Sequence, residues 1–105
     1  MASTTINQLQ LFQQNLQNIV QQKQMLESQM MEIDSALEEL KTTSNSYKIL
    51  GKIMVSVSTE KLTMELQNKK EVLQLRFSTV EKQEMMLTQN IEKIQQEVVN
   101  ELKKK

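Results

Sequence analysis

An apolar residue recurs every three or four positions along the first 40 residues, and this repeat constrains the fold more than any other feature. Its members are Leu9, Phe12, Leu16, Ile19, Lys23, Leu26, Met30, Ile33, Leu37 and Leu40. All but Lys23 are apolar. A strict 3.5-residue repeat sustained over more than four heptads is typical of a coiled-coil seam, which requires a partner helix.

The second half of the chain carries a matching repeat. Its members are Leu66, Lys70, Leu73, Phe77, Val80, Glu84, Leu87, Ile91, Ile94 and Val98. All but Lys70 and Glu84 are apolar. Between residues 41 and 58 the repeat stops, and Thr, Ser and Asn gather at positions 42–46. This composition favours the end of one helix and a connector before the next.

Two helices, at about residues 5–43 and 59–103, are therefore expected. With one Gly and no Pro among 105 residues, almost nothing in the chain interrupts a helix. Ser58 is suited to cap the second helix because its hydroxyl can accept from a free backbone N–H, and Glu60 suits the positive end of the helix dipole. The short connector predicts an antiparallel helical hairpin.

Two charged seam residues test this pairing. Counting outward from the connector along both helices brings Lys23 to within about one turn of Glu84. In one interpretation their long stems pack on the seam while the charged heads stay hydrated. In the other, the pair fixes the register of the two helices, as polar seam residues do in coiled coils.

The connector has the composition of a β-hairpin at about residues 46–57. β-branched and aromatic residues concentrate there around the single Gly of the chain. Gly51 followed by Lys52 suits a type II′ turn, which needs Gly at its first central position. In that register Leu50 faces Ile53 and Ile49 faces Met54, so both faces of the hairpin carry apolar side chains.

An isolated hairpin of this kind is marginal in water and exposes two open edges. We therefore expect it to pair with strands of other chains in an oligomeric sheet or β-barrel; the alternative is that it folds back on the base of its own coiled coil. The expected interface residues are Tyr47, Ile49, Leu50, Gly51, Ile53, Met54, Val55 and Val57.

The composition excludes several classes of function. His and Cys are absent, which removes the common general base, the thiolate nucleophile and the imidazole and thiolate metal ligands. Thirteen basic and thirteen acidic residues alternate without a basic stripe, so nucleic-acid binding is not indicated. No signal peptide or membrane span is evident. We expect a non-enzymatic, cytoplasmic protein that needs no metal or cofactor.

The segment Tyr47-Lys48-Ile49-Leu50-Gly51, followed by residues 69–76 (KKEVLQLR) and 80–84 (VEKQE), resembles the β-class subunit of prefoldin. The resemblance covers nearly the whole chain and implies a single prefoldin-like domain over residues 1–105. It further implies a heterohexamer of two α-class and four β-class subunits around a β-barrel platform. Such complexes are ATP-independent holdase chaperones that capture non-native polypeptides at coiled-coil tips and deliver them to a group II chaperonin.

The resemblance places client binding near the two ends of the chain. The expected residues are Ile6, Leu9, Leu11, Phe12, Ile94, Val98, Val99 and Leu102. The alternative is that these residues only close the last turns of the coiled coil. The first 22 residues carry no charge and are rich in Gln and Asn, which suits either an adaptable tip surface or ordinary solvated positions.

The tail Lys103-Lys104-Lys105 suits the negative end of a helix dipole or an acidic chaperonin surface. The competing interpretation of the whole chain is a structural coiled-coil spacer without chaperone activity. That interpretation accounts for both heptad repeats but leaves the β-hairpin unexplained.

Overall fold

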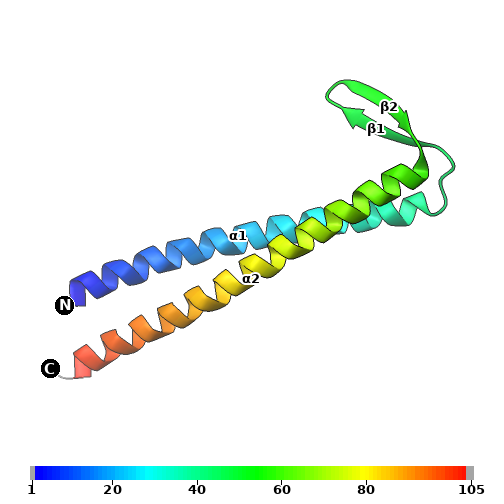
Figure 1. Cartoon of the computed structure of the whole chain (residues 1–105). Helices are drawn as coiled ribbons and strands as arrows, with labels where there is room; N and C mark the ends of the chain where they lie inside the picture. Colours follow the sequence, from blue (N-terminus) through cyan, green and yellow to red (C-terminus); the bar gives the residue numbers. More distant parts are fainter. Residues whose placement is uncertain (1, 104–105) are drawn as a thin grey trace. The chain divides into compact units, whose positions relative to one another are not determined.

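The computed structural model describes residues 2–103 and contains two long helices joined by a β-hairpin (Figure 1). In chain order the elements are α1 (Ala2–Leu40), β1 (Ser46–Leu50), β2 (Ile53–Val57) and α2 (Thr59–Lys103). The predicted fold, a two-helix hairpin with a β-hairpin between the helices, is confirmed. Residues 104 and 105 of the basic tail lie outside the described residues.

The chain forms two compact units. The terminal unit comprises residues 1–25 and 77–105, and the hairpin unit comprises residues 26–76. Each unit pairs a stretch of α1 with a stretch of α2. That residues 1–105 make one domain stays a prediction.

The seam positions are buried or half-buried along both helices. In the terminal unit Val80, Ile91 and Ile94 are buried, and in the hairpin unit Ile33 and Leu73 are buried. Every other member of the two repeats is half-buried. No described side chain is completely buried, because a core one seam wide leaves each residue an exposed flank. The burial of both repeats agrees with the coiled-coil interpretation, which stays a prediction.

Helix α1 ends at Leu40, three residues before the predicted end at about residue 43. The backbone N–H of Lys41 donates to the carbonyl of Glu38, and that of Thr42 donates to Glu39, at N···O distances of 3.3 Å. The hydroxyl of Thr43 also donates to the Glu39 carbonyl, at 2.7 Å. These short-range bonds satisfy the carbonyls of Glu38 and Glu39 where the helix ends.

The same helix begins at Ala2, earlier than the predicted start at about residue 5. No Gly or Pro interrupts residues 2–5, so nothing in the sequence ends the helix between residue 5 and Ala2. Helix α2 begins at Thr59 as predicted, and Ser58 caps it. The Ser58 hydroxyl accepts from the Lys61 backbone N–H at 3.2 Å, while its carbonyl accepts from Leu62 at 3.0 Å.

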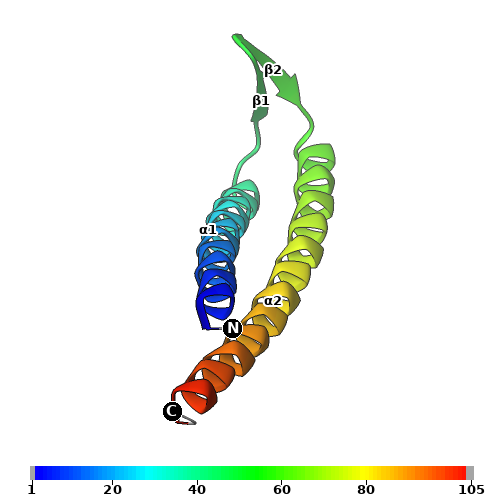
Figure 2. The same cartoon turned by 90° about the vertical axis from the view of Figure 1, so that its left-hand side faces the viewer.

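Strands β1 and β2 form a two-stranded antiparallel sheet beyond the ends of the helices that they connect (Figure 2). Leu50 pairs with Ile53 and Ile49 with Met54, which confirms the predicted register. Gly51 has a φ of 61°, and it alone among the described residues has a positive φ. A positive φ at the first central residue only is the pattern of the predicted type II′ turn.

Candidate functional site

The β-hairpin exposes most of its apolar side chains. Successive strand residues point to opposite faces, so Tyr47, Ile49 and Met54 share one face while Leu50 and Ile53 share the other. The exposed apolar residues of the hairpin are Tyr47, Ile49, Leu50, Ile53, Met54 and Val55, with exposed fractions of 40% to 68%. Monomeric proteins rarely leave so many neighbouring apolar residues open to water.

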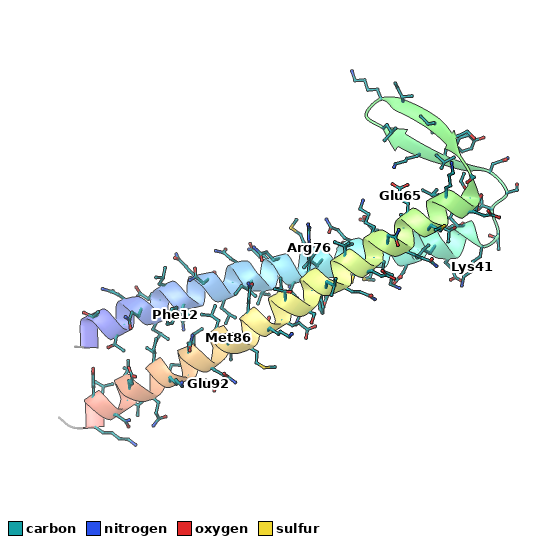
Figure 3. All side chains as sticks on the ribbon, in the orientation of Figure 1. Phe12, Lys41, Glu65, Arg76, Met86 and Glu92 are labelled. Atoms are coloured by element: carbon teal, nitrogen blue, oxygen red, sulfur yellow. The ribbon has the colours of Figure 1, made fainter. Side chains whose placement is uncertain are left out.

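Polar contacts tie the base of the hairpin to the start of α2. Ser46 is buried, and its Oγ lies 2.9 Å from Oγ1 of Thr59. The Lys48 ammonium forms an ion pair with the carboxylate of Glu65, which is labelled in Figure 3. These contacts hold the base of the hairpin, whereas its apolar residues stay exposed apart from the half-buried Val57.

Both strands are also edge strands, because the sheet has two strands. Each therefore presents one row of backbone N–H and C=O groups without a partner strand. The eight expected interface residues lie together on this hairpin, and Gly51 forms its turn. Their role in assembly stays a prediction.

The eight expected client-binding residues fall into two groups in the terminal unit. Leu9, Phe12 and Val98 are half-buried on the seam, and Ile94 is buried there. Off the seam, the exposed members are Ile6, Leu11, Val99 and Leu102, with exposed fractions of 42%, 55%, 43% and 66%. Client binding by either group stays a prediction, but the second group offers the more exposed apolar surface.

The two oppositely charged seam residues of the terminal unit meet. Nζ of Lys23 lies 3.4 Å from Oε1 of Glu84, with about three quarters of each side chain covered. The same ammonium lies 5.6 Å from the centroid of the Phe77 ring. The predicted approach of Lys23 to Glu84 is confirmed.

Comparisons with known proteins agree with this architecture. A family model described as a prefoldin subunit matches residues 3–105. The chain belongs to the prefoldin subunit family. The prefoldin subunit beta of Pyrococcus horikoshii is 32% identical over 96 residues, which cover 89% of this chain and 82% of the relative. That of Methanospirillum hungatei is 36% identical over 100 residues, covering 92% and 83%.

A solved structure supports the same assignment. The crystal structure of the prefoldin beta subunit from Thermococcus strain KS-1 matches with a TM-score of 0.90 and 30% identity, covering 96% of this chain and 91% of that chain. The predicted membership of the β class of prefoldin is confirmed. A prefoldin subunit is part of a chaperone, and the family is not an enzyme family.

In this prefoldin subunit the structure also reveals contacts that sequence reasoning missed. Lys70, the third charged seam residue, forms an ion pair with Asp34 of α1 in the hairpin unit. The ammonium therefore turns out of the seam toward a carboxylate on its flank. The only signal in the sequence was that Asp34 directly follows the seam residue Ile33.

A groove between the two helices of the terminal unit was also missed. This amide groove has a volume of about 470 Å³. Its lining residues are Asn15, Asn18, Ile19 and Gln22 of α1 with Gln83, Met86, Leu87 and Asn90 of α2. Carboxamides beside seam positions of both helices were the available signal.

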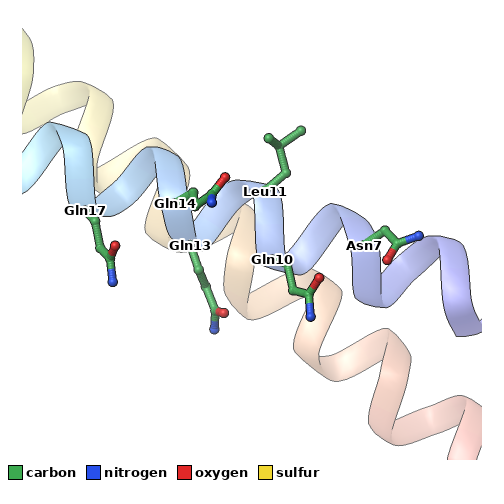
Figure 4. A pocket seen from close by; sticks show the side chains of 6 residues that line it. All are labelled: Asn7, Gln10, Leu11, Gln13, Gln14 and Gln17. Atoms are coloured by element: carbon green, nitrogen blue, oxygen red, sulfur yellow. The ribbon is translucent and has the colours of Figure 1, made fainter.

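Carboxamides also line the neighbouring surface of α1. Figure 4 shows Gln10, Gln13 and Gln17 pointing to the same side of the helix and Leu11 pointing to another. In this prefoldin subunit the exposed Leu11 thus lies among uncharged polar groups. Among residues 2–103, no helix is long and apolar enough to span a membrane. Nor does any group of His, Cys, Asp and Glu in that part of the chain suit a metal ion.

Proposed function

We propose that the chain is a β-class subunit of an ATP-independent holdase chaperone. Four copies join two α-class subunits through their β-hairpins, which form a β-barrel platform in the cytoplasm. The coiled coils carry non-native polypeptides at their tips and pass them to a group II chaperonin. The observation that carries this proposal is the hairpin itself, which is apolar on both faces and open at both edges.

Assembly removes two unfavourable features of the exposed hairpin, namely its unpaired strand edges and its apolar side chains in water. Strand pairing with neighbouring subunits satisfies the open edges, and stacking buries apolar area at about 25 cal/mol per Å². The ion pair between Lys48 and Glu65 and the bond between Ser46 and Thr59 anchor the hairpin to its own helix. The hairpin is therefore presented to partners from a fixed base.

Client capture rests on several weak contacts at once. Each coiled coil offers the exposed side chains of Ile6, Leu11, Val99 and Leu102. One such tip holds a client weakly, whereas several tips on one platform act together through a high effective concentration. Because each contact is weak, release needs no ATP.

Molar mass in solution tests the assembly. Light scattering behind size exclusion is measured on this chain alone and after mixing with an α-class subunit from the same source. A mass of two partners and four copies of this chain is expected. A discrete monomer or dimer that ignores the partner supports a structural coiled-coil spacer instead and overturns the proposal.

Holdase activity is measured next on the assembled complex. Turbidity is followed after a chemically denatured client is diluted into buffer without ATP. Suppression of aggregation is expected at a stoichiometric ratio of complex to client. Transfer is then followed as refolding after a group II chaperonin and ATP are added. If Lys103 and the two lysines that follow dock on an acidic chaperonin surface, salt is expected to weaken transfer but not client capture.

A further inference from the structure

The amide groove of the terminal unit carries no charge at positions where coiled coils usually carry charge. Residues that flank a seam commonly form ion pairs across the two helices. Here Asn15, Gln22, Gln83 and Asn90 each directly precede a seam residue, and all four are carboxamides. None of the groove's lining residues is charged, although the chain has 13 basic and 13 acidic residues. The lining of the groove therefore offers no counter-charge to a charged ligand.

These carboxamides are free to bind. The side chains of Asn15, Gln22, Gln83 and Asn90 are exposed, and within residues 2–103 none of them forms a hydrogen bond with another protein group. A carboxamide offers both N–H donors and a carbonyl acceptor, which is the same inventory as a peptide group. The rim of the groove thus matches a polypeptide main chain.

The floor of the groove is apolar. Ile19 and Leu87 are half-buried seam residues, and Met86, labelled in Figure 3, is 65% exposed beside them. A flexible thioether adapts to side chains of different shape. From Asn15 to Gln22 the helix rises about 10 Å, which accommodates about three residues of an extended chain.

We propose that the amide groove binds a short, extended, uncharged segment of a non-native polypeptide. The segment's peptide groups exchange hydrogen bonds with the carboxamides of Asn15, Gln22, Gln83 and Asn90, and its apolar side chains pack on Ile19 and Leu87. Folded proteins pair their peptide groups internally, whereas a non-native chain leaves them available. This inference rests on the proposed function and adds to the apolar tips a main-chain contact that favours unfolded segments.

The test compares two full-length variants in the assembled complex. Asn15→Ala/Asn90→Ala removes two carboxamides of the groove, and Gln24→Ala/Gln96→Ala removes two exposed carboxamides outside it. Alanine is the better helix former at all four positions, so loss of folding does not explain a loss of binding. The probe is a labelled short peptide of Ser, Thr, Val and Leu, measured by fluorescence anisotropy beside a copy whose main-chain nitrogens are methylated at alternate residues.

The expected loss of affinity for the unmodified peptide is about tenfold in the groove variant, from two net hydrogen bonds, and none in the control. Methylation weakens binding to the wild-type complex about three- to tenfold and weakens binding to the groove variant less, because the bonds it removes are already absent. Equal affinity of both variants, or an equal methylation effect in wild type and groove variant, overturns the proposal. So does a change of molar mass in the groove variant, which assigns the groove to an interface between subunits.

The two proposals fail separately. If the wild-type complex and the groove variant suppress client aggregation equally well, the proposed binding in the groove is contradicted and the holdase function is not. A wild-type complex that suppresses no aggregation contradicts the holdase function and, with it, the groove.

Discussion

The Nζ atom of Lys23 lies 3.4 Å from Oε1 of Glu84, and both residues occupy positions of an otherwise largely apolar seam. Lys23 also lies against the face of Phe77. An unpaired charge at either position is costly because about three quarters of the side chain is covered. The pair therefore disfavours any slip that separates the two residues, as polar seam residues do in other coiled coils.

Reversing one of these charges is expected to destabilise the chain. Lys23→Glu brings two carboxylates together and removes the cation from Phe77, which lowers the free energy of unfolding by about 1–2 kcal/mol. Urea denaturation followed by circular dichroism measures the change at one fixed protein concentration. The double variant Lys23→Glu/Glu84→Lys restores opposite charges and is expected to recover part of the loss. Equal stability of wild type and single variant contradicts a role for the pair in register.

The cap of α2 makes a second, independent contribution. Ser58→Ala removes the acceptor for the Lys61 N–H and is expected to lower the free energy of unfolding by about 1 kcal/mol. Ser58→Asp keeps an acceptor and adds a favourable charge at the helix N-terminus, so it is expected to match wild type. Ser78→Ala, an exposed serine within α2, serves as the matched control, and its stability is expected to be unchanged or slightly raised. If Ser58→Ala and Ser78→Ala have the same free energy of unfolding, the cap does not contribute to stability.

The turn of the β-hairpin depends on the backbone of Gly51. A Cβ there would meet no atom within 4 Å, so any cost of Gly51→Ala comes from its φ of 61°. That strain is expected to lower the stability of the hairpin by about 1 kcal/mol. The hydrogen-exchange rates of the strand amides then rise about fivefold. Lys52→Ala changes the neighbouring turn residue, whose φ is ordinary, and is expected to leave exchange unchanged. Equal exchange rates in both variants indicate that the turn is not under this constraint.

Assembly is expected to fail when charge is placed on the exposed hairpin. Ile53→Asp/Val55→Asp puts two carboxylates on strand β2, where burial against other subunits would leave them unpaired. Light scattering should show loss of the assembly with an α-class subunit, while circular dichroism should show unchanged helix content. Met31→Asp/Met64→Asp adds the same charge at exposed positions on the helices of the hairpin unit and is expected to assemble normally. A charged hairpin that still assembles contradicts the barrel interface.

Much of this fold follows from the sequence because its two periodic patterns leave few alternatives. The 3.5-residue repeats specify the half-buried seam, and the short connector brings Lys23 to Glu84 by counting along two helices of known rise. Gly51 specifies the turn and thereby the pairing of Leu50 with Ile53.

Features that depend on side-chain choices among near-equal alternatives were not predictable. At the end of α1 threonine hydroxyls and short backbone bonds satisfy the carbonyls of Glu38 and Glu39. Such local bonds compete with another helical turn. Lys70 can reach either flank of its seam, and its partner Asp34 is evident only from the folded chain. The amide groove needs the register of both helices and the space between their side chains, neither of which a single repeat contains.

Client capture at the tips is expected to depend on the exposed apolar residues near the ends of the two helices. Val99→Ser/Leu102→Ser shortens two side chains with exposed fractions of 43% and 66%. Each loses about 1 kcal/mol of apolar contact with a client, and several coiled coils lose it together, so the complex should release clients at least about tenfold faster.

The matched control is Met25→Ser/Met85→Ser, two residues of the same unit that are each 64% exposed but lie away from the described ends of the helices. Dilution of a denatured client into each complex, followed by light scattering, compares their capacity to prevent aggregation. The tip variant should protect less than wild type while the methionine variant protects equally. If both variants protect alike, the off-seam residues only complete the last turns of the coiled coil. The interaction with clients then depends on apolar exposure in general or on the seam residues Leu9, Phe12 and Val98.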